Sequence, residues 1–132
     1  QGIVMKKIIC LLFVWCFMLT NLSAAPAYKW EFMALKSTQY PYWENVVGKT
    51  VATKNHGGDI IEVLVDVLGT GDKTSVDIEY VNMSLYQKFD LVNSSNVIVG
   101  TRYHYIKYGN THSSALLRAK DYSTTKAILG FN

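Results

Sequence analysis

Cysteine is nearly absent from this 132-residue chain, whose two cysteines, Cys10 and Cys16, both lie near the N-terminus. Beyond Cys16, no disulfide, thiolate metal site or thiol nucleophile is possible. Small exported domains often depend on disulfides, so a domain made from the rest of this chain has to be stabilised by burial alone. About 100 residues are enough to build one hydrophobic core.

The chain also lacks a strong excess of charge of either sign. The formal net charge is +3, but Lys6 and Lys7 lie in the N-terminal segment, and without them 11 basic residues stand against 10 acidic ones. No run of basic residues follows, which excludes an electrostatic footprint for nucleic acid. The two prolines, Pro26 and Pro41, mark no linker, and we find no repeat or low-complexity tract. We therefore predict a single domain.

Long hydrophobic runs are limited to residues 8–19. The basic segment Met5-Lys6-Lys7 precedes this run, and small residues ending in Ala25-Pro26-Ala27 follow it. A basic start, an apolar run of about a dozen residues and an A-x-A ending are the parts of a secretory signal peptide. A membrane anchor is the alternative, but a spanning helix needs about 20 apolar residues, and this run is shorter.

These features divide the chain into two parts. Residues 1–27 are predicted to contain a few upstream residues before Met5 and an N-terminal signal helix, with cleavage after Ala27 or, alternatively, after Ala25. Residues 28–132 are predicted to form one secreted β domain, extracellular or periplasmic, with no membrane span.

The predicted domain is rich in Val, Ile, Thr and Tyr, which favour β-structure. Alternating apolar and polar residues, separated by turn residues, predict strands at 28–32, 50–53, 60–68, 74–81, 84–92, 97–108, 113–120 and 125–129. Residues 115–120 are also compatible with a short helix. The pattern predicts an all-β fold, a small single-domain antiparallel β-sandwich or barrel of about seven or eight short strands.

The strongest strand pattern covers residues 60–68, where one face is wholly β-branched and apolar (Ile61, Val63, Val65 and Val67). Residues 69–73 are typical of a turn, so we expect 60–68 and 74–81 to form a hairpin. In its second strand, Val76, Ile78 and Tyr80 are expected to face the core, and Asp77 and Glu79 the solvent. In the first strand of the domain, Trp30 and Phe32 are expected to face the core.

No catalytic or metal-binding motif is present. His56, His104 and His112 form no H-x-H or H-x-x-x-H pair, and we expect His56 to be exposed in a turn with Gly57-Gly58. No G-x-S-x-G motif occurs. We therefore predict no catalytic residue, no metal site and no cofactor, and we do not expect an enzyme.

Two aromatic segments are candidate binding sites. The first is a loop with Tyr40, Tyr42 and Trp43; the second is a strand with Arg102, Tyr103, Tyr105 and Lys107. Aromatic rings with a polar group are common in binding surfaces. The alternatives are a solvated face of a tyrosine-rich sheet and, for Trp43, a cap on the core. If the binding hypothesis holds, Trp43 should lie at the surface near Tyr103 or Tyr105 and beside Arg102 or Lys107.

Three stretches in order resemble the YolA-like family of small secreted bacterial proteins. They are Ser37-Thr38-Gln39-Tyr40 with Trp43-Glu44, then Lys54-Asn55-His56-Gly57-Gly58, and then Phe89-Asp90-Leu91 with Gly100-Thr101-Arg102-Tyr103-His104-Tyr105. The resemblance implies export and a compact domain, and no activity. A calcium-loop-like pattern expected after Asp90 is not present here, because Asp90 is its only carboxylate.

The sequence therefore predicts a secreted β domain that binds a surface glycan or another cell-envelope component. A secreted antibacterial toxin is the alternative, and a hydrolase is third. An extended exposed apolar patch would favour the toxin, and convergent polar groups in a pocket would favour the enzyme.

Overall fold

The computed structural model describes residues 26–70 and 73–132, which form a two-layered β-sandwich. The predicted signal peptide, apart from Pro26 and Ala27, lies outside these residues. The described residues form nine strands: β1 (Lys29–Ser37), β2 (Glu44–Asn45), β3 (Ile61–Leu68), β4 (Thr74–Ile78), β5 (Val81–Asn82), β6 (Ser84–Val92), β7 (Ile98–Lys107), β8 (Ala115–Asp121) and β9 (Thr124–Phe131). They contain no helix, and so none that could cross a membrane.

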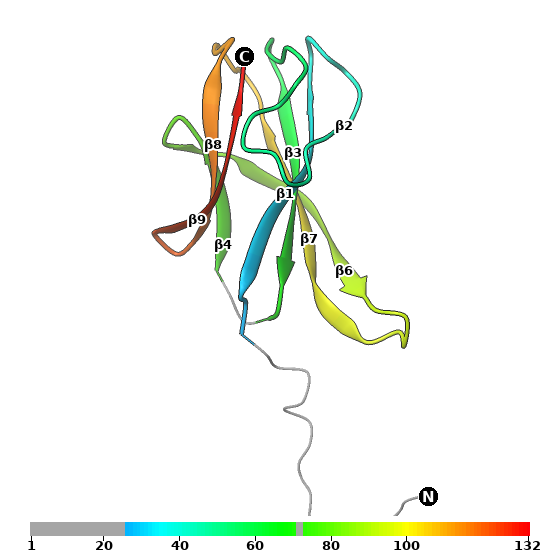
Figure 1. Ribbon diagram of the computed structural model, residues 1–132. Helices are drawn as coiled ribbons and strands as arrows, with labels where there is room; N and C mark the ends of the chain where they lie inside the picture. Colours follow the sequence, from blue (N-terminus) through cyan, green and yellow to red (C-terminus); the bar gives the residue numbers. More distant parts are fainter. Residues whose placement is uncertain (1–25, 71–72) are drawn as a thin grey trace, which may run out of the picture.

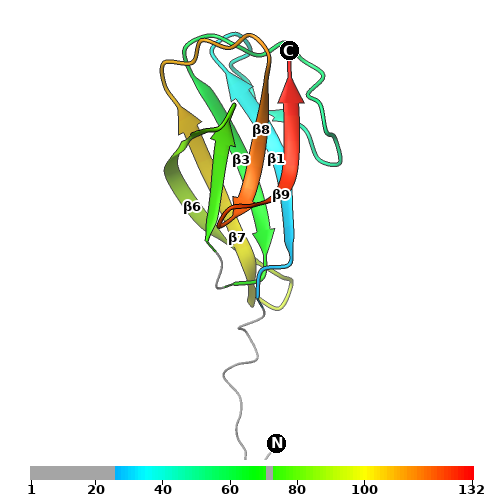
Figure 2. The same ribbon diagram turned by 90° about the vertical axis from the view of Figure 1, so that its left-hand side faces the viewer.

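The strands form two antiparallel sheets. The large sheet has the order β2-β1-β3-β7-β6 and the small sheet the order β5-β4-β8-β9. Figures 1 and 2 show the small sheet packed over one face of the large one. The predicted fold class, in its sandwich form, is confirmed, and residues 115–120 are strand rather than helix.

The core lies between the sheets, and β3 is at its centre. Its apolar face is buried as predicted, since Ile61, Val63, Val65 and Val67 are at most 1% exposed. Trp30 and Phe32 of β1 and Val76 and Ile78 of β4 also face this core, as predicted. The small sheet adds Leu117 of β8 and Leu129 of β9. A strand pattern of period two therefore identified the inner faces correctly.

The predicted hairpin between residues 60–68 and 74–81 is wrong. β3 pairs with β1 on one side and with β7 on the other, so both of its edges are occupied. β4 instead lies in the small sheet, between β5 and β8. The segment between β3 and β4 thus crosses from one sheet to the other. Both strands need a buried apolar face, and facing each other across the core satisfies this need as well as pairing side by side does.

Three local predictions also need correction. Tyr80 does not face the core but is 77% exposed, because Glu79 and Tyr80 adopt positive φ in the turn before β5. Asp77 lies on the outer side, as predicted, yet is fully buried beneath Arg118 and Lys120. Residues 50–53 form no strand, only an isolated bridge between Val51 and Gly130.

The first strand is longer than predicted, and a β-bulge interrupts its alternation just after residue 32, where the predicted strand ended. β1 continues to Ser37, and its pairing with β3 shifts between Phe32 and Ala34. The extra residue breaks the alternation, so Leu35 and Ser37 return to the buried side. After the bulge, β1 pairs with β2, which directly follows Trp43.

Candidate binding site

The outer face of the large sheet carries a groove of about 400 Å³. Four strands and one loop line it, with Lys36 from β1, Trp43 from the loop before β2, Leu64 from β3, Phe89, Asp90 and Leu91 from β6, and Arg102 and His104 from β7. The register explains this grouping, because Leu64 pairs with His104 and Phe89 pairs with Arg102. Directly paired residues share one face of a sheet.

Trp43 lines the groove and is 39% exposed. The next residue, Glu44, pairs with Leu35 of β1, which fixes where the loop returns to the sheet. The ammonium group of Lys36 lies 4.7 Å from the indole centroid, and the His104 ring meets the indole edge to face at 5.3 Å. Tyr86 also packs against His104, and the centroids of the two rings are 4.9 Å apart.

Ion pairs fix the charged side chains in and around the groove. Arg102 donates two hydrogen bonds to Asp66, at 2.7 and 2.9 Å, and these raise the pKa of the guanidinium above its ordinary value. Nε2 of His104 is 2.9 Å from Glu62, and Lys36 lies 3.8 Å from the same carboxylate. The polar groups are therefore fixed in position, and their charges nearly balance.

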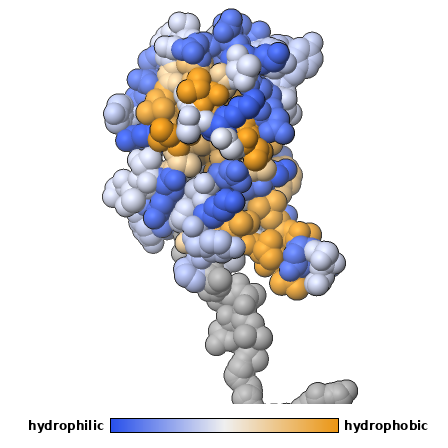
Figure 3. All heavy atoms as spheres, in the orientation of Figure 1, coloured by the Kyte–Doolittle hydropathy of each residue, from blue (hydrophilic) through white to orange (hydrophobic). Residues whose placement is uncertain are grey.

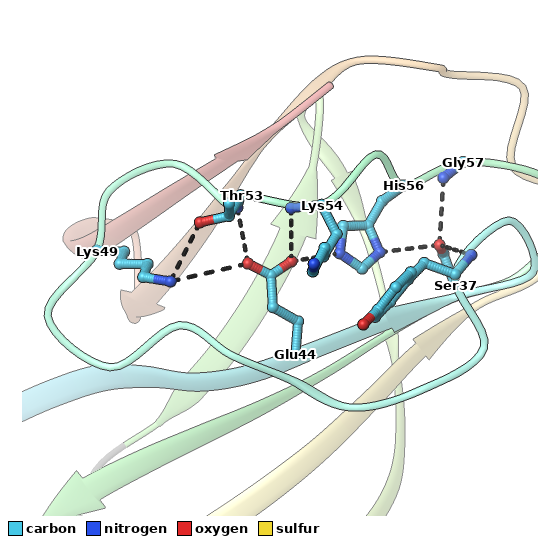
Figure 4. Close-up of polar contacts among 8 residues, drawn as sticks. Ser37, Glu44, Lys49, Thr53, Lys54, His56 and Gly57 are labelled. Atoms are coloured by element: carbon cyan, nitrogen blue, oxygen red, sulfur yellow. Dashed lines mark hydrogen bonds and ion pairs between the residues drawn. The ribbon is translucent and has the colours of Figure 1, made fainter.

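A second polar cluster lies beneath the loop that carries Trp43. Ser37, Glu44 and His56 are all buried, and Figure 4 shows them in one line. The Ser37 hydroxyl is 2.9 Å from Nδ1 of His56, and Nε2 of His56 is 2.9 Å from Glu44. The prediction that His56 is exposed is wrong, since it is 1% exposed. The adjacent glycines allow a turn that folds this ring inward.

The order Ser, His and Glu is that of a hydrolytic triad, but the hydroxyl does not have the environment of a nucleophile. Its oxygen accepts backbone N–H groups from Tyr40 at 3.1 Å and Gly57 at 3.3 Å, so its own proton is directed to Nδ1 of His56. Ser37 is 3% exposed, which leaves no room for a substrate carbonyl. The cluster instead ties residues 37–44 to residues 53–57.

Glu44 completes this cluster through backbone hydrogen bonds. Its carboxylate accepts N–H groups from Thr53 at 2.7 Å and Lys54 at 3.1 Å. Burial acts to raise the pKa of Glu44, but the hydrogen bonds from His56, Thr53 and Lys54 outweigh it, so the pKa lies below its ordinary value. The cluster therefore holds an ionised carboxylate directly beside Trp43.

Comparison with known proteins places the chain in one family. Residues 22–128 match the model of a family described as a domain of unknown function, DUF4879. The chain belongs to this family. No curated protein and no solved structure matches it. In the described part of this DUF4879 domain, no group of three His, Cys, Asp or Glu side chains is arranged to hold a metal ion.

Of the seven residues predicted as binding residues from the sequence, only two belong to the groove. Trp43 and Arg102 both line the groove. Tyr105 is 4% exposed and belongs to the core, where its hydroxyl donates to the Thr74 carbonyl of the small sheet. Tyr103 packs partly buried against the same core. The expected pairing of Trp43 with one of these tyrosines is wrong, because both rings lie on the inner face of β7.

The remaining three residues lie outside the groove. Tyr40 packs edge to face on His56, with centroids 5.6 Å apart. Tyr42 is 68% exposed but does not line the groove. Lys107 donates to the Tyr108 carbonyl near the other end of β7.

The sequence did not predict the other six groove residues, which are Lys36, Leu64, Phe89, Asp90, Leu91 and His104. The alternation in β7 already separated Arg102 and His104 from Tyr103 and Tyr105, but left open which face meets the core. The number of tyrosines favoured the wrong face as the exposed one. Tyrosine is amphipathic and packs well against a core when its hydroxyl finds a partner, as Tyr105 does.

Proposed function

We propose that this domain is a secreted binding protein whose groove accepts a glycan of a cell surface or another cell-envelope component. The observation that carries this proposal is the partly exposed Trp43 in a groove of about 400 Å³ that Lys36, Arg102 and His104 also line. A volume of this size suits a small ligand such as one or two sugar rings.

The chemistry of the groove matches the two kinds of surface that a sugar presents. Aromatic side chains such as Trp43 and Phe89 can pack against the C–H faces of a ring. Ion-paired groups such as Glu62 and Asp66 keep free lone pairs that accept hydrogen bonds from hydroxyls. Because these side chains are already held by Arg102, His104 and Lys36, little side-chain entropy is lost on binding.

A binding role is favoured over hydrolysis because the triad-like cluster described above has no free nucleophile. Ser37, His56 and Glu44 satisfy one another and are closed to solvent. The resemblance to the YolA-like family supports secretion. It implies no activity, so the proposed binding role rests on the groove.

Replacement of Trp43 by alanine is expected to abolish glycan binding and to leave the melting temperature nearly unchanged, because the indole is partly exposed and outside the core. A glycan and cell-envelope panel with the purified domain, followed by calorimetry on any hit, measures the first effect. Tyr42→Ala is the matched control, since Tyr42 is exposed in the same loop but outside the groove. Equal loss of binding in both variants, or unfolding of Trp43→Ala, would refute the groove as the site.

A membrane-active toxin is a second candidate, because the β6–β7 hairpin exposes apolar side chains. Val92, Val97 and Ile98 near its turn are 47–52% exposed, and Figure 3 shows hydrophobic residues gathered where this hairpin projects. Leakage of dye from anionic vesicles tests this candidate. Loss of leakage in Ile98→Asp with retained glycan binding would assign the hairpin to membranes.

Secretion itself has a direct readout. The exported protein is expected to begin at Tyr28, because Ala25-Pro26-Ala27 is the predicted cleavage motif. Intact-mass analysis of the protein from the culture medium or periplasm measures this end. A mass that still includes Cys10 and Cys16 would contradict removal of a signal peptide.

A further inference from the structure

One edge of the large sheet is formed by β6, and this strand is unusually exposed. Eight of its nine residues are exposed, on both faces of the sheet. Figure 1 shows the β6–β7 hairpin diverging from the small sheet, so the small sheet does not cover it. A long exposed edge strand presents unpaired N–H and C=O groups that can pair with another strand.

The hydrogen bonds around β7 show which residues of β6 present these groups. The N–H of Gly69, just after β3, donates to the Val99 carbonyl. Val99 and every second residue after it therefore direct their backbone N–H and C=O groups toward β3. The backbone groups of Gly100 and Arg102 are therefore directed toward β6, where these residues form hydrogen-bonded pairs with Leu91 and Phe89. It follows that Lys88 and Asp90 direct their backbone groups to the free edge.

The same two residues carry opposite charges. Both are exposed, and neither forms an ion pair with any other residue that the structure describes. Lys88 pairs with Tyr103 and Asp90 with Thr101, so both side chains lie on the same face of the strand. Phe89 and Leu91 lie on the opposite face, that of the groove, and Asp90 also borders the groove at this edge of the sheet.

From this arrangement we infer that the domain forms a two-fold dimer in which β6 pairs antiparallel with β6 of a second copy. The register places Lys88 of each copy opposite Asp90 of the other, as a hydrogen-bonded pair, and it places the two copies of Phe89 together on the axis. The two adjacent registers that also match the backbone groups would oppose lysine to lysine or aspartate to aspartate. Like charges directly opposite each other disfavour a pair of strands.

Two features limit the pairing to this register. The β-bulge between Leu85 and Gln87 interrupts one end of β6, and another irregularity follows Leu91. Residues 87–91 remain regular, and they are centred on Phe89. A lysine in an edge strand normally discourages association with unrelated strands, so only a strand with an acidic residue opposite Lys88 is accepted.

The dimer changes the proposed ligand site as well. Phe89 is 43% exposed and lines the groove of its own copy. In the dimer, Phe89 of the second copy lies directly beside it, and the two grooves join into one surface across ten strands. This consequence rests on the proposed function, whereas the dimer itself does not.

Sedimentation equilibrium of the secreted domain is expected to show a monomer–dimer equilibrium. Lys88→Glu and Asp90→Lys each turn both cross-strand charge pairs into like pairs, so each is expected to raise the dissociation constant of the dimer about tenfold or more. The double variant Lys88→Glu/Asp90→Lys exchanges the charges and is expected to restore the wild-type value. An equimolar mixture of the two single variants is expected to form a heterodimer, because both of its pairs are again opposite in sign.

Lys126→Glu is the control, since it reverses a charge on the other long edge strand, β9. It should leave the dissociation constant unchanged. A wild-type protein that stays monomeric up to its solubility limit would overturn the inference, as would a dimer that the single variants do not weaken or the double variant does not restore. A monomer that binds anionic vesicles would assign the open hairpin to a membrane instead. Trp43→Ala is expected to dimerise normally, which separates this test from that of the groove.

Discussion

Replacement of Val65 by aspartate is expected to leave the domain unfolded at neutral pH. Val65 is fully buried on β3, the central strand, between Phe32 of β1 and Tyr103 of β7. The change removes about 1.5–3 kcal/mol of apolar burial, and a carboxylate without a partner in that place costs several kcal/mol more. The sum is comparable to the whole stability of about 5–15 kcal/mol that is usual for a domain of this size.

Circular dichroism and urea titration of the purified variant measure this loss. Val81→Asp introduces the same side chain at a valine of β5 that is 53% exposed, and it is expected to change the free energy of unfolding by less than about 1 kcal/mol. A Val65→Asp protein that unfolds at the wild-type urea concentration would show that the inner face of β3 is not the core.

The sequence predicted the strands better than their partners, for a physical reason. Alternation records which face of a strand is buried, and it located the inner faces of β3 and β4 correctly. Two strands with apolar faces can satisfy them by pairing edge to edge or by packing face to face across a core. Nothing local to residues 60–81 distinguishes these outcomes, because the choice depends on β1 and β7 occupying both edges of β3.

The groove could be predicted only in part, because it is built from four strands and a loop. Trp43 and Arg102 were recognisable by residue type, but their neighbours are set by cross-strand register. The buried cluster could not be predicted for a related reason. Ser37, Glu44 and His56 are separated by 7 and 12 residues, a spacing that matches no motif, and the glycines after His56 suggested an exposed turn.

Replacement of Glu44 by glutamine is expected to destabilise the domain by about 3 kcal/mol at neutral pH. Both carboxylate oxygens accept hydrogen bonds, from Thr53 on one side and from Lys54 and His56 on the other. A glutamine amide turns one of these acceptors into a donor that faces another donor. Leaving buried donors without acceptors costs about 1–3 kcal/mol, and more when a charged group is involved.

The dependence of stability on pH gives this prediction a second readout. The pKa of Glu44 is lower in the folded domain than its ordinary value of 4.5, so the folded state binds its proton less readily than the unfolded chain does. The stabilisation from this carboxylate is therefore complete above about pH 4.5 and is lost as the pH falls through the folded pKa. The pKa of Asp77 is also lowered, since its hydrogen bonds from Arg118 and Lys120 outweigh the effect of burial, and it acts in the same direction.

Urea titrations between neutral and acid pH should consequently show a steeper loss of stability for the wild type than for Glu44→Gln, which retains only the contribution of Asp77 and weaker groups. Glu31→Gln is the matched control, because Glu31 forms only a partly exposed ion pair with Lys29 at 3.8 Å and should contribute less than about 1 kcal/mol. Parallel curves for wild type and Glu44→Gln would show that the cluster does not hold an ionised carboxylate.

Because Glu44 directly follows Trp43, the same variant is expected to weaken the binding of any ligand that contacts the indole, even where the domain remains folded. The buried cluster would then act on binding by fixing the loop from beneath, without touching the ligand.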